Sequence, residues 1–222
     1  MCGRYDLHTP LPVIAQRWFG ITDAVSEPPP RYNIPPGTTI TMVRDWDGDI
    51  QFDLAHWGYR PRWAGDDAPR PINAKAETVA SSRYFRHAFQ RQRCLIPANG
   101  WFEWTQGQTG KQPHYITQLN TQADDVLFFA GIWEGSIEDG FCTAILTEPA
   151  AQNLNHIHSR QPVVLDPECR YDWLSSTITD RDEIKKAARR LDPEKLTSWL
   201  VTPAMNRPDH DLPDVIEPLS ER

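Results

Sequence analysis

Short segments in which apolar and polar residues alternate constrain the fold of this chain more than any other feature. Residues 39–42 and 50–54 both alternate in this way, and the turn-forming pair Asp47-Gly48 lies between them. This pattern predicts a β-hairpin. Further apolar segments expected to form strands cover 94–98, 113–117, 126–133, 141–146 and 163–165. Because several connections are short, antiparallel pairing is favoured.

Helical spacing is confined to short segments. Residues 11–19 carry apolar side chains at helical intervals, and Gly20 is expected to end that helix. A second helix is expected over 83–92, started by a serine cap. A third is expected to run from a Thr147 cap through Asn153.

The last part of the chain contains three aspartates that resemble helix caps. Asp166 and Asp192 each precede a proline, which suits the first helical position, and Asp180 can cap a helix between them. We therefore expect helices here. Residues 199–222, rich in proline and acidic groups, are expected to wrap the surface as an extended tail.

Hydropathy and cysteine usage exclude several classes of protein. No apolar stretch in the 222 residues approaches the roughly 20 needed to cross a bilayer, and the N-terminus lacks the cationic and apolar regions of a signal peptide. The four cysteines, at 2, 94, 142 and 169, form no C-x-x-C pair. This spacing argues against a structural zinc site or a disulfide framework. A cytoplasmic protein with reduced thiols and no membrane contact is expected.

The charge distribution leaves nucleic-acid binding open. A net charge of −7 would ordinarily disfavour it. Residues 60–93, however, hold eight basic side chains against three acidic ones, a local excess of five positive charges. Within this stretch, Trp63 stands between arginines and is interpreted either as a base-stacking residue or as ordinary core.

The N-terminal Met1-Cys2-Gly3-Arg4 offers unusual chemistry. A small residue after the start methionine favours its removal, which would leave Cys2 with two adjacent nucleophiles. Its thiol would titrate near about 8.5 and its α-amine near about 8. Together they can capture an aldehyde, first as an imine and then as a thiazolidine, which an internal cysteine cannot form. The alternative is that Cys2 is an incidental residue in a frayed terminus.

Two further segments suggest acid–base chemistry. Glu103 stands among Trp101, Phe102 and Trp104, where desolvation would raise the pKa of its carboxyl, although a surface Glu on an amphipathic strand is an equal alternative. His156 and His158 lie two residues apart. Without a further ligand cluster, a general acid or base is favoured over a metal site.

Several motifs together resemble the SOS response-associated peptidase (SRAP) family of abasic-site processing proteins. They occur in the family's order and span nearly the whole chain. The matching segments are Met1-Cys2-Gly3-Arg4-Tyr5, Arg31-Tyr32-Asn33, Pro36-Gly37-Thr38, Trp57-Gly58, Ile72-Asn73-Ala74, Glu77-Thr78, Ser82-Arg83, Gly100-Trp101-Phe102-Glu103-Trp104, Ile157-His158, Arg160 and Pro162.

The resemblance implies a fold and a reaction. The fold would be a single α+β domain over residues 1–222, whose antiparallel sheets form a barrel-like core with peripheral helices. The activity would be covalent capture of abasic sites in single-stranded DNA by Cys2, with Asn73 positioning it, Glu103 shuttling protons and His158 helping the sugar open.

The resemblance also implies a DNA path. Phosphates would be held by Arg4, Arg83 and Arg160, and bases would meet Trp63 and Trp104. Further DNA contacts are expected from Asn33, Pro36 and Lys75. Lys75 and Gln161 stand where relatives often carry arginine, so the share of each phosphate contact is expected to differ.

No cofactor or metal is expected, and the protein is expected to act as a monomer. Lyase and autopeptidase activities are compatible with the family. Two other classes remain open: a thiol peptidase with Cys2 as nucleophile and His158 as base, and a module that binds single-stranded or modified DNA without reacting with it.

Overall fold

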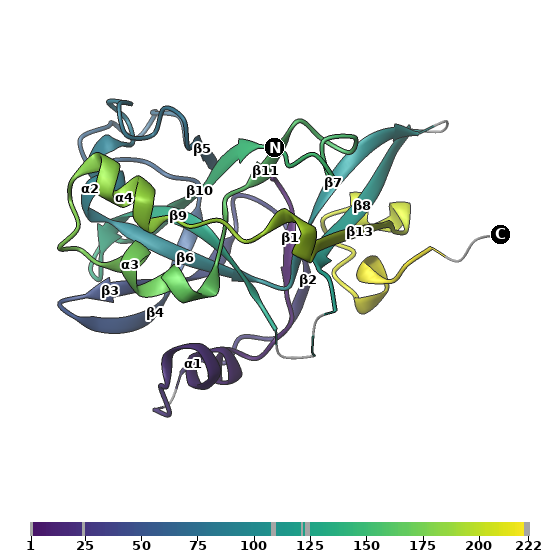
Figure 1. The fold of residues 1–222 in the computed structure, drawn as a ribbon, viewed down its shortest axis with the longest axis horizontal. Helices are drawn as coiled ribbons and strands as arrows, with labels where there is room; N and C mark the ends of the chain where they lie inside the picture. Colours follow the sequence, from purple (N-terminus) through teal and green to yellow (C-terminus); the bar gives the residue numbers. More distant parts are fainter. Residues whose placement is uncertain (1, 24, 108–109, 121, 123–124, 220–222) are drawn as a thin grey trace.

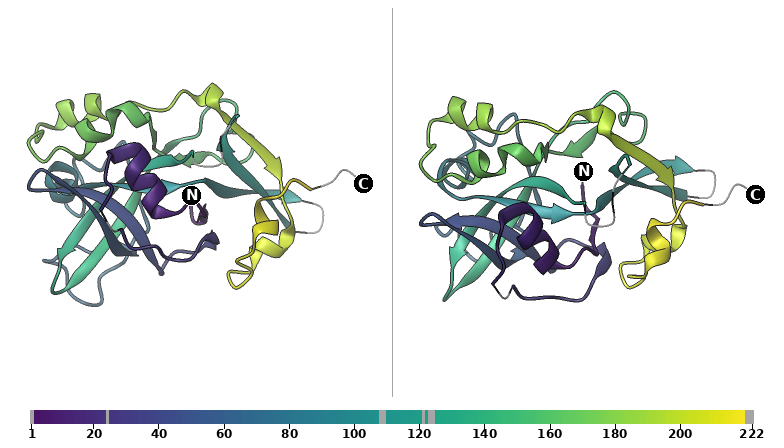
Figure 2. Two further views of the ribbon diagram at one scale, coloured as in Figure 1. Left: turned by 90° about the horizontal axis from the view of Figure 1, so that it is seen from below. Right: turned by 60° about the horizontal axis from the view of Figure 1, so that its bottom comes forward.

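The computed structural model of the protein describes residues 2–23, 25–107, 110–120, 122 and 125–219 (Figure 1). Two sheets form its centre, and short helices lie at the periphery (Figure 2). Almost all strand pairs are antiparallel, which confirms the expected α+β class. Among the described residues, no helix has the length and apolar character needed to cross a membrane.

One sheet closes on itself as a ring. Its strands follow the order β10-β4-β3-β6-β9, and β9 pairs again with β10. These strands are β3 (Thr39–Trp46), β4 (Asp49–Trp57), β6 (Arg93–Ala98), β9 (Leu127–Ser136) and β10 (Gly140–Pro149). The short strands β5 (Asn73–Lys75), β11 (Arg160–Pro162) and β12 (Val164–Leu165) extend the ring. The ring confirms the expected barrel-like core.

The second sheet holds the N-terminal strand in its interior. Its order is β13-β8-β7-β1-β2. The strands are β1 (Tyr5–Leu7), β2 (Arg31–Ile34), β7 (Gly100–Gly107), β8 (Gly110–Gln118) and β13 (Leu196–Leu200). Only Asn99 separates β6 from β7, so the chain passes directly from the ring into this sheet. The Asn99 side chain accepts hydrogen bonds from the backbone N–H groups of His8 and Thr9, at 2.8 and 3.1 Å.

The predicted hairpin is confirmed as β3 and β4, paired in register from Thr39↔His56 to Trp46↔Asp49. Asp47 and Gly48 adopt φ values of 54° and 94°. A two-residue turn of this kind needs positive φ at both positions, which the Asp-Gly pair tolerates. The local sequence signal and the observed structure therefore agree.

The helices are short, and they agree only in part with expectation. α1 (Leu11–Phe19) is confirmed, and Gly20 ends it with φ 68°. α4 (Arg181–Ala187) is capped by Asp180 as expected. The remaining helices are α2 (Arg86–Arg91) and α3 (Arg170–Leu174).

The serine cap predicted for the second helix is wrong. Ser82 Oγ accepts from the Tyr84 N–H at 3.2 Å in the turn that precedes α2, and the helix itself has no side-chain cap. The serine therefore stabilises the turn, and the helix begins four residues later, at Arg86.

The helix predicted from Thr147 to Asn153 is also wrong, because no part of that segment is helical. Strand β10 continues to Pro149, and its last residues pair with β11, Thr147 opposite Pro162. Threonine suits a pleated, half-buried surface, and here the available partner strand decides the conformation.

The C-terminal part contains single turns of 3₁₀ helix. Asp166 and Asp192 cap the first two as expected, whereas the last two lie in the segment that was expected to be an extended tail. These turns are η1 (Pro167–Cys169), η2 (Pro193–Lys195), η3 (Pro203–Asn206) and η4 (Pro213–Ile216). After η2 the chain forms β13, which pairs with β8 from Leu196↔Gln118 to Leu200↔His114. Beyond it, Val201, Met205 and Val215 pack against Phe102 and Tyr115.

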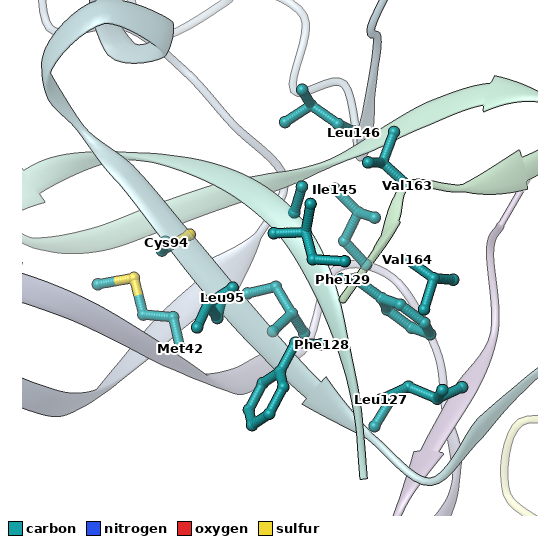
Figure 3. Close-up of a cluster of buried hydrophobic side chains, with 14 of the residues drawn as sticks. Met42, Cys94, Leu95, Leu127, Phe128, Phe129, Ile145, Leu146, Val163 and Val164 are labelled. Atoms are coloured by element: carbon teal, nitrogen blue, oxygen red, sulfur yellow. The ribbon is translucent and has the colours of Figure 1, made fainter. Parts of the chain in front are cut away.

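The main core packs on both faces of the ring strands. Leu95 of β6, Phe128 and Phe129 of β9 and Ile145 of β10 are completely buried and lie close together (Figure 3). Cys94 belongs to the same cluster, as expected for a small core residue. This rigid ring fixes the strand ends on which the candidate site is built.

Candidate active site and nucleic-acid interface

The position of Cys2 follows from the pairing of β1 with β7. Tyr5 lies opposite Trp101, and the Phe102 N–H donates to the Arg4 carbonyl at 3.0 Å. The described chain therefore begins alongside the segment of β7 that carries Glu103. Cys2 itself is completely buried.

Asn73 contacts Cys2 directly. It lies on β5, which pairs in parallel with β10, Asn73 opposite Ile145. Its Nδ2 donates to the Cys2 carbonyl at 2.8 Å. Its buried Oδ1 accepts no hydrogen bond from any residue that the structure describes. One end of the amide thus holds the Cys2 backbone, and the other offers an acceptor within the site.

Glu103 is a buried carboxyl in β7, with 2% of its surface exposed. Burial raises its pKa to about 7. Because side chains alternate along a strand, Glu103 shares a face with Trp101, whereas Phe102 and Trp104 pack into the smaller cluster on the other face. The raised pKa expected from the sequence is present, but only one of the three aromatic neighbours shares that face.

His158 lies in the loop that precedes β11. Its Nδ1 is 3.9 Å from Glu103 Oε2. Its side chain is 31% exposed, and partial burial lowers its pKa. The site therefore brings together a histidine that is neutral near physiological pH and a carboxyl that titrates there.

The Cys2 thiol is strongly held in its protonated form. Burial is the main reason for its raised pKa, and the nearby Glu103 carboxylate raises it further. Such a thiol is a poor nucleophile until a base removes its proton. Cys2, Asn73, Glu103 and His158 thus lie together, and their catalytic roles stay predictions.

Arg4 and Asn33 are bound to the C-terminal part of the chain. Arg4 Nη1 donates to Asn33 Oδ1 at 2.6 Å and to the Met205 carbonyl at 3.2 Å. Asn33 is completely buried, and its Nδ2 donates to the carbonyls of Met205, Arg207 and His210. In this arrangement Asn33 positions Arg4, and a DNA contact by Arg4 would use its remaining N–H groups.

Trp104 also reaches this C-terminal turn, because its Nε1 donates to Asn206 Oδ1 at 2.6 Å. Lys75, two residues beyond Asn73 on β5, is exposed. Pro36 is exposed too, in the turn where Gly37 adopts φ 78°. Lys75 and Pro36 are thus accessible to a ligand, whereas Trp104 is only partly exposed.

Trp63 lies in an exposed aromatic and basic cluster. Its side chain is 59% exposed, so the core alternative does not apply. Its ring meets Tyr84 edge-on, with centroids 5.8 Å apart, and the Arg83 guanidinium lies 5.3 Å from its centroid. This arrangement suits the stacking of a base beside a cation.

Arg160 has a partner that the motif did not indicate. Its guanidinium makes a bidentate ion pair with Glu77, including Nη2 to Oε2 at 3.0 Å, and Nη2 donates to the Thr147 carbonyl at 2.7 Å. Sequence reasoning missed this pairing because Glu77 and Arg160 are 83 residues apart. Within the described residues, no group of three or more His, Cys, Asp or Glu side chains could hold a metal ion.

Comparison with known proteins shows that the chain matches one protein family. A model described as SOS response associated peptidase (SRAP) matches residues 1–208. The abasic site processing protein YedK of Escherichia coli (strain K12) is 36% identical over 178 residues, which cover 78% of this chain and 77% of YedK. The abasic site processing protein YoqW of Bacillus subtilis (strain 168) is 28% identical over 226 residues, which cover 98% of this chain and 99% of YoqW.

Solved structures share the fold. A protein from Bacteroides thetaiotaomicron superimposes with a TM-score of 0.82 at 21% identity, covering 99% of this chain and 100% of that chain. A phage-related protein from Bordetella bronchiseptica gives a TM-score of 0.71 at 29% identity, covering 90% of this chain and 94% of that one.

Proposed function

Because this chain belongs to the SOS response associated peptidase (SRAP) family, we propose that it captures abasic sites in single-stranded DNA through a covalent bond to Cys2. Its relatives YedK and YoqW are named abasic site processing proteins. The observation that carries the proposal is the position of the Cys2 backbone, held by Asn73 beside a buried carboxyl that titrates near neutral pH.

The reaction requires removal of Met1, so that Cys2 gains a free α-amine. An abasic deoxyribose opens to an aldehyde, and the amine adds to its C1′ carbon. Loss of water leaves an imine. The thiol sulfur then bonds to the imine carbon while its proton passes to the imine nitrogen, which closes a five-membered thiazolidine ring.

Glu103 supplies the proton transfers. With a pKa of about 7, it is present in both forms at neutral pH. Its acid form can protonate the departing hydroxyl during imine formation, and its carboxylate can remove the thiol proton during ring closure. Because the thiol pKa is raised, the second step depends on this base.

Asn73 and His158 prepare the reactants. The Asn73 Nδ2 contact fixes the Cys2 carbonyl, and its Oδ1 is suited to accept a hydrogen bond from the freed α-amine. His158, close to Glu103, is suited to helping the closed sugar open to its aldehyde.

Basic and aromatic side chains that are at least partly exposed define the proposed DNA path. Arg4, Lys75 and Arg83 would neutralise phosphates, while Trp63 and Trp104 would contact bases. Phosphate contacts position the strand without reading its sequence, which suits a protein that recognises a lesion at any position.

A thiol peptidase fits the geometry less well. Such enzymes rely on a thiolate with a depressed pKa, whereas burial raises the pKa of Cys2. Lyase activity would proceed from the same imine by β-elimination at the sugar, so ring closure by the thiol would compete with strand cleavage.

Mass spectrometry of the protein mixed with an abasic oligonucleotide tests the proposal. The expected product has the mass of the protein without Met1 plus the oligonucleotide, minus one water. Retention of the oligonucleotide that disappears at high salt, without any such product, would instead identify a non-covalent DNA-binding module.

Replacement of Glu103 is expected to slow the reaction and to change its pH dependence. The raised pKa means that the carboxylate becomes available as a base only as pH rises through about 7. The parent rate of crosslinking should therefore increase through this range, and Glu103→Gln should lack that inflection. The expected loss in rate is about 10²–10⁴-fold. Single-turnover rates from pH 5 to 9 measure this, and an unchanged profile would exclude Glu103 as the base.

Removal of Arg83 is expected to weaken the salt dependence of DNA binding. Each neutralised phosphate of single-stranded DNA contributes roughly 0.7 to the slope of log K against log salt. Arg83→Ala should lower the slope by about that amount. Arg17→Ala, an exposed arginine on α1 paired with Asp125, serves as the control and should leave the slope unchanged. Equal slopes for Arg83→Ala and the parent would remove Arg83 from the path.

A further inference from the structure

The ion pair of Arg160 with Glu77 links the two segments that carry Asn73 and His158. Glu77 follows β5 by two residues, and Arg160 is the first residue of β11. Both Nη atoms of Arg160 bind the Glu77 carboxylate, and Nη2 also donates to the Thr147 carbonyl of β10. The Arg160 side chain is only 16% exposed, compared with 46% for Glu77.

The backbone of Arg160 in turn determines how His158 is held. The Arg160 N–H donates to His158 Nδ1 at 3.0 Å. A ring nitrogen that accepts a hydrogen bond carries no proton, so a neutral His158 has its proton on Nε2. The same Nδ1 lies 3.1 Å from the Arg160 carbonyl, which would accept a hydrogen bond from the Nδ1-protonated tautomer.

We infer that Glu77 is a positioning residue: through Arg160 it fixes the loop that holds His158 as the Nε2-protonated tautomer beside Glu103. The inference rests on the proposed function for its catalytic meaning. It also assigns Arg160 a structural task in place of the phosphate contact that the family resemblance implies.

The charges around the pair support this assignment. Arg160 holds the pKa of Glu77 down at about 2, so the carboxylate is ionised at neutral pH. A DNA phosphate would have to displace that carboxylate from both Nη atoms. Among the described residues, Glu103 from β7 and Arg160 from β11 are charged groups close to His158.

Three substitutions separate a positioning role from a phosphate contact. Glu77→Gln and Arg160→Gln each break the ion pair. Arg160→Lys keeps a positive charge but loses the planar fork that binds a carboxylate through two nitrogens. If Arg160 positions His158, all three variants should slow crosslinking by about 10- to 100-fold, as expected for a displaced catalytic group. The salt slope of DNA binding should not change.

The tautomer of His158 can be measured in the absence of DNA. In the free protein, ¹⁵N-labelled imidazole spectra should show the Nε2-protonated form for the parent and a mixture of tautomers for Glu77→Gln. Glu148→Gln is the matched control, because it removes a neighbouring carboxylate that pairs with Arg190 at 2.9 Å. It should change neither the spectrum nor the rate.

The outcomes distinguish a failure of the proposed function from a failure of the positioning role of Glu77. Failure of the parent to form an adduct would reject the proposed function, whereas the spectra would still test the positioning role. An unchanged tautomer in Glu77→Gln would overturn the inference. So would a salt slope that falls by about 0.7 in Arg160→Gln and is preserved in Arg160→Lys, because that result identifies a phosphate contact.

Discussion

A Cys2→Ala variant is expected to form no covalent adduct with an abasic oligonucleotide while still binding single-stranded DNA. The substitution removes the sulfur that closes the thiazolidine ring, and the remaining amine can reach only the reversible imine. The proposed phosphate contacts come from other residues, so non-covalent affinity should stay close to that of the parent. Denaturing gel electrophoresis with labelled oligonucleotide measures the adduct.

A second thiol provides the control for this experiment. Cys142 is partly buried on β10, and its Sγ contacts the backbone of Arg60. Cys142→Ala removes a thiol at a different place, and this variant should crosslink like the parent. A stable adduct with Cys2→Ala, or its loss in Cys142→Ala, would show that Cys2 is not the residue that bonds to the sugar.

Any residue retained ahead of Cys2 is expected to abolish the adduct as completely as removal of the thiol. An amide nitrogen is not nucleophilic enough to form the imine, so the thiol has no imine carbon to attack. A variant with a cleavable extension tests this directly. Before cleavage it should give no adduct, and after cleavage to a free Cys2 amine it should crosslink at the parent rate.

This experiment also separates two ways in which the thiol might react. A thiol alone can add to an aldehyde as a hemithioacetal, which reverses on denaturation. If the extended protein gave an adduct that survived denaturation, the thiazolidine mechanism would be wrong even though Cys2 might still be the attachment point.

Local patterns in the sequence predicted the parts of the fold that local interactions determine. The β3–β4 hairpin follows from alternation and an Asp-Gly turn, and α1 follows from helical spacing ended by Gly20. Thr147 shows what local sequence patterns cannot predict. A threonine can cap a helix or occupy a strand, and only the distant partner β11 decides between them.

The candidate site, like the fold, could be predicted only in part from local sequence patterns. The chemistry of an N-terminal cysteine can be read from four residues, and the family resemblance supplied Asn73, Glu103 and His158 as its companions. Periodicity alone could not place them together, since β1 meets β7 across almost 100 residues of sequence. Asn33 was expected to contact DNA, but it is completely buried, and its Nδ2 donates to the Met205 carbonyl.

The burial of Cys2 also has a consequence for the order of events during synthesis. β1 becomes an interior strand once β2 and β7 lie on either side of it. Strand β7 begins at Gly100. At roughly 5–20 residues per second, the ribosome needs about 5–20 s to reach this point. Cys2 can therefore reach its buried position only after this interval, when β7 is available to pair with β1.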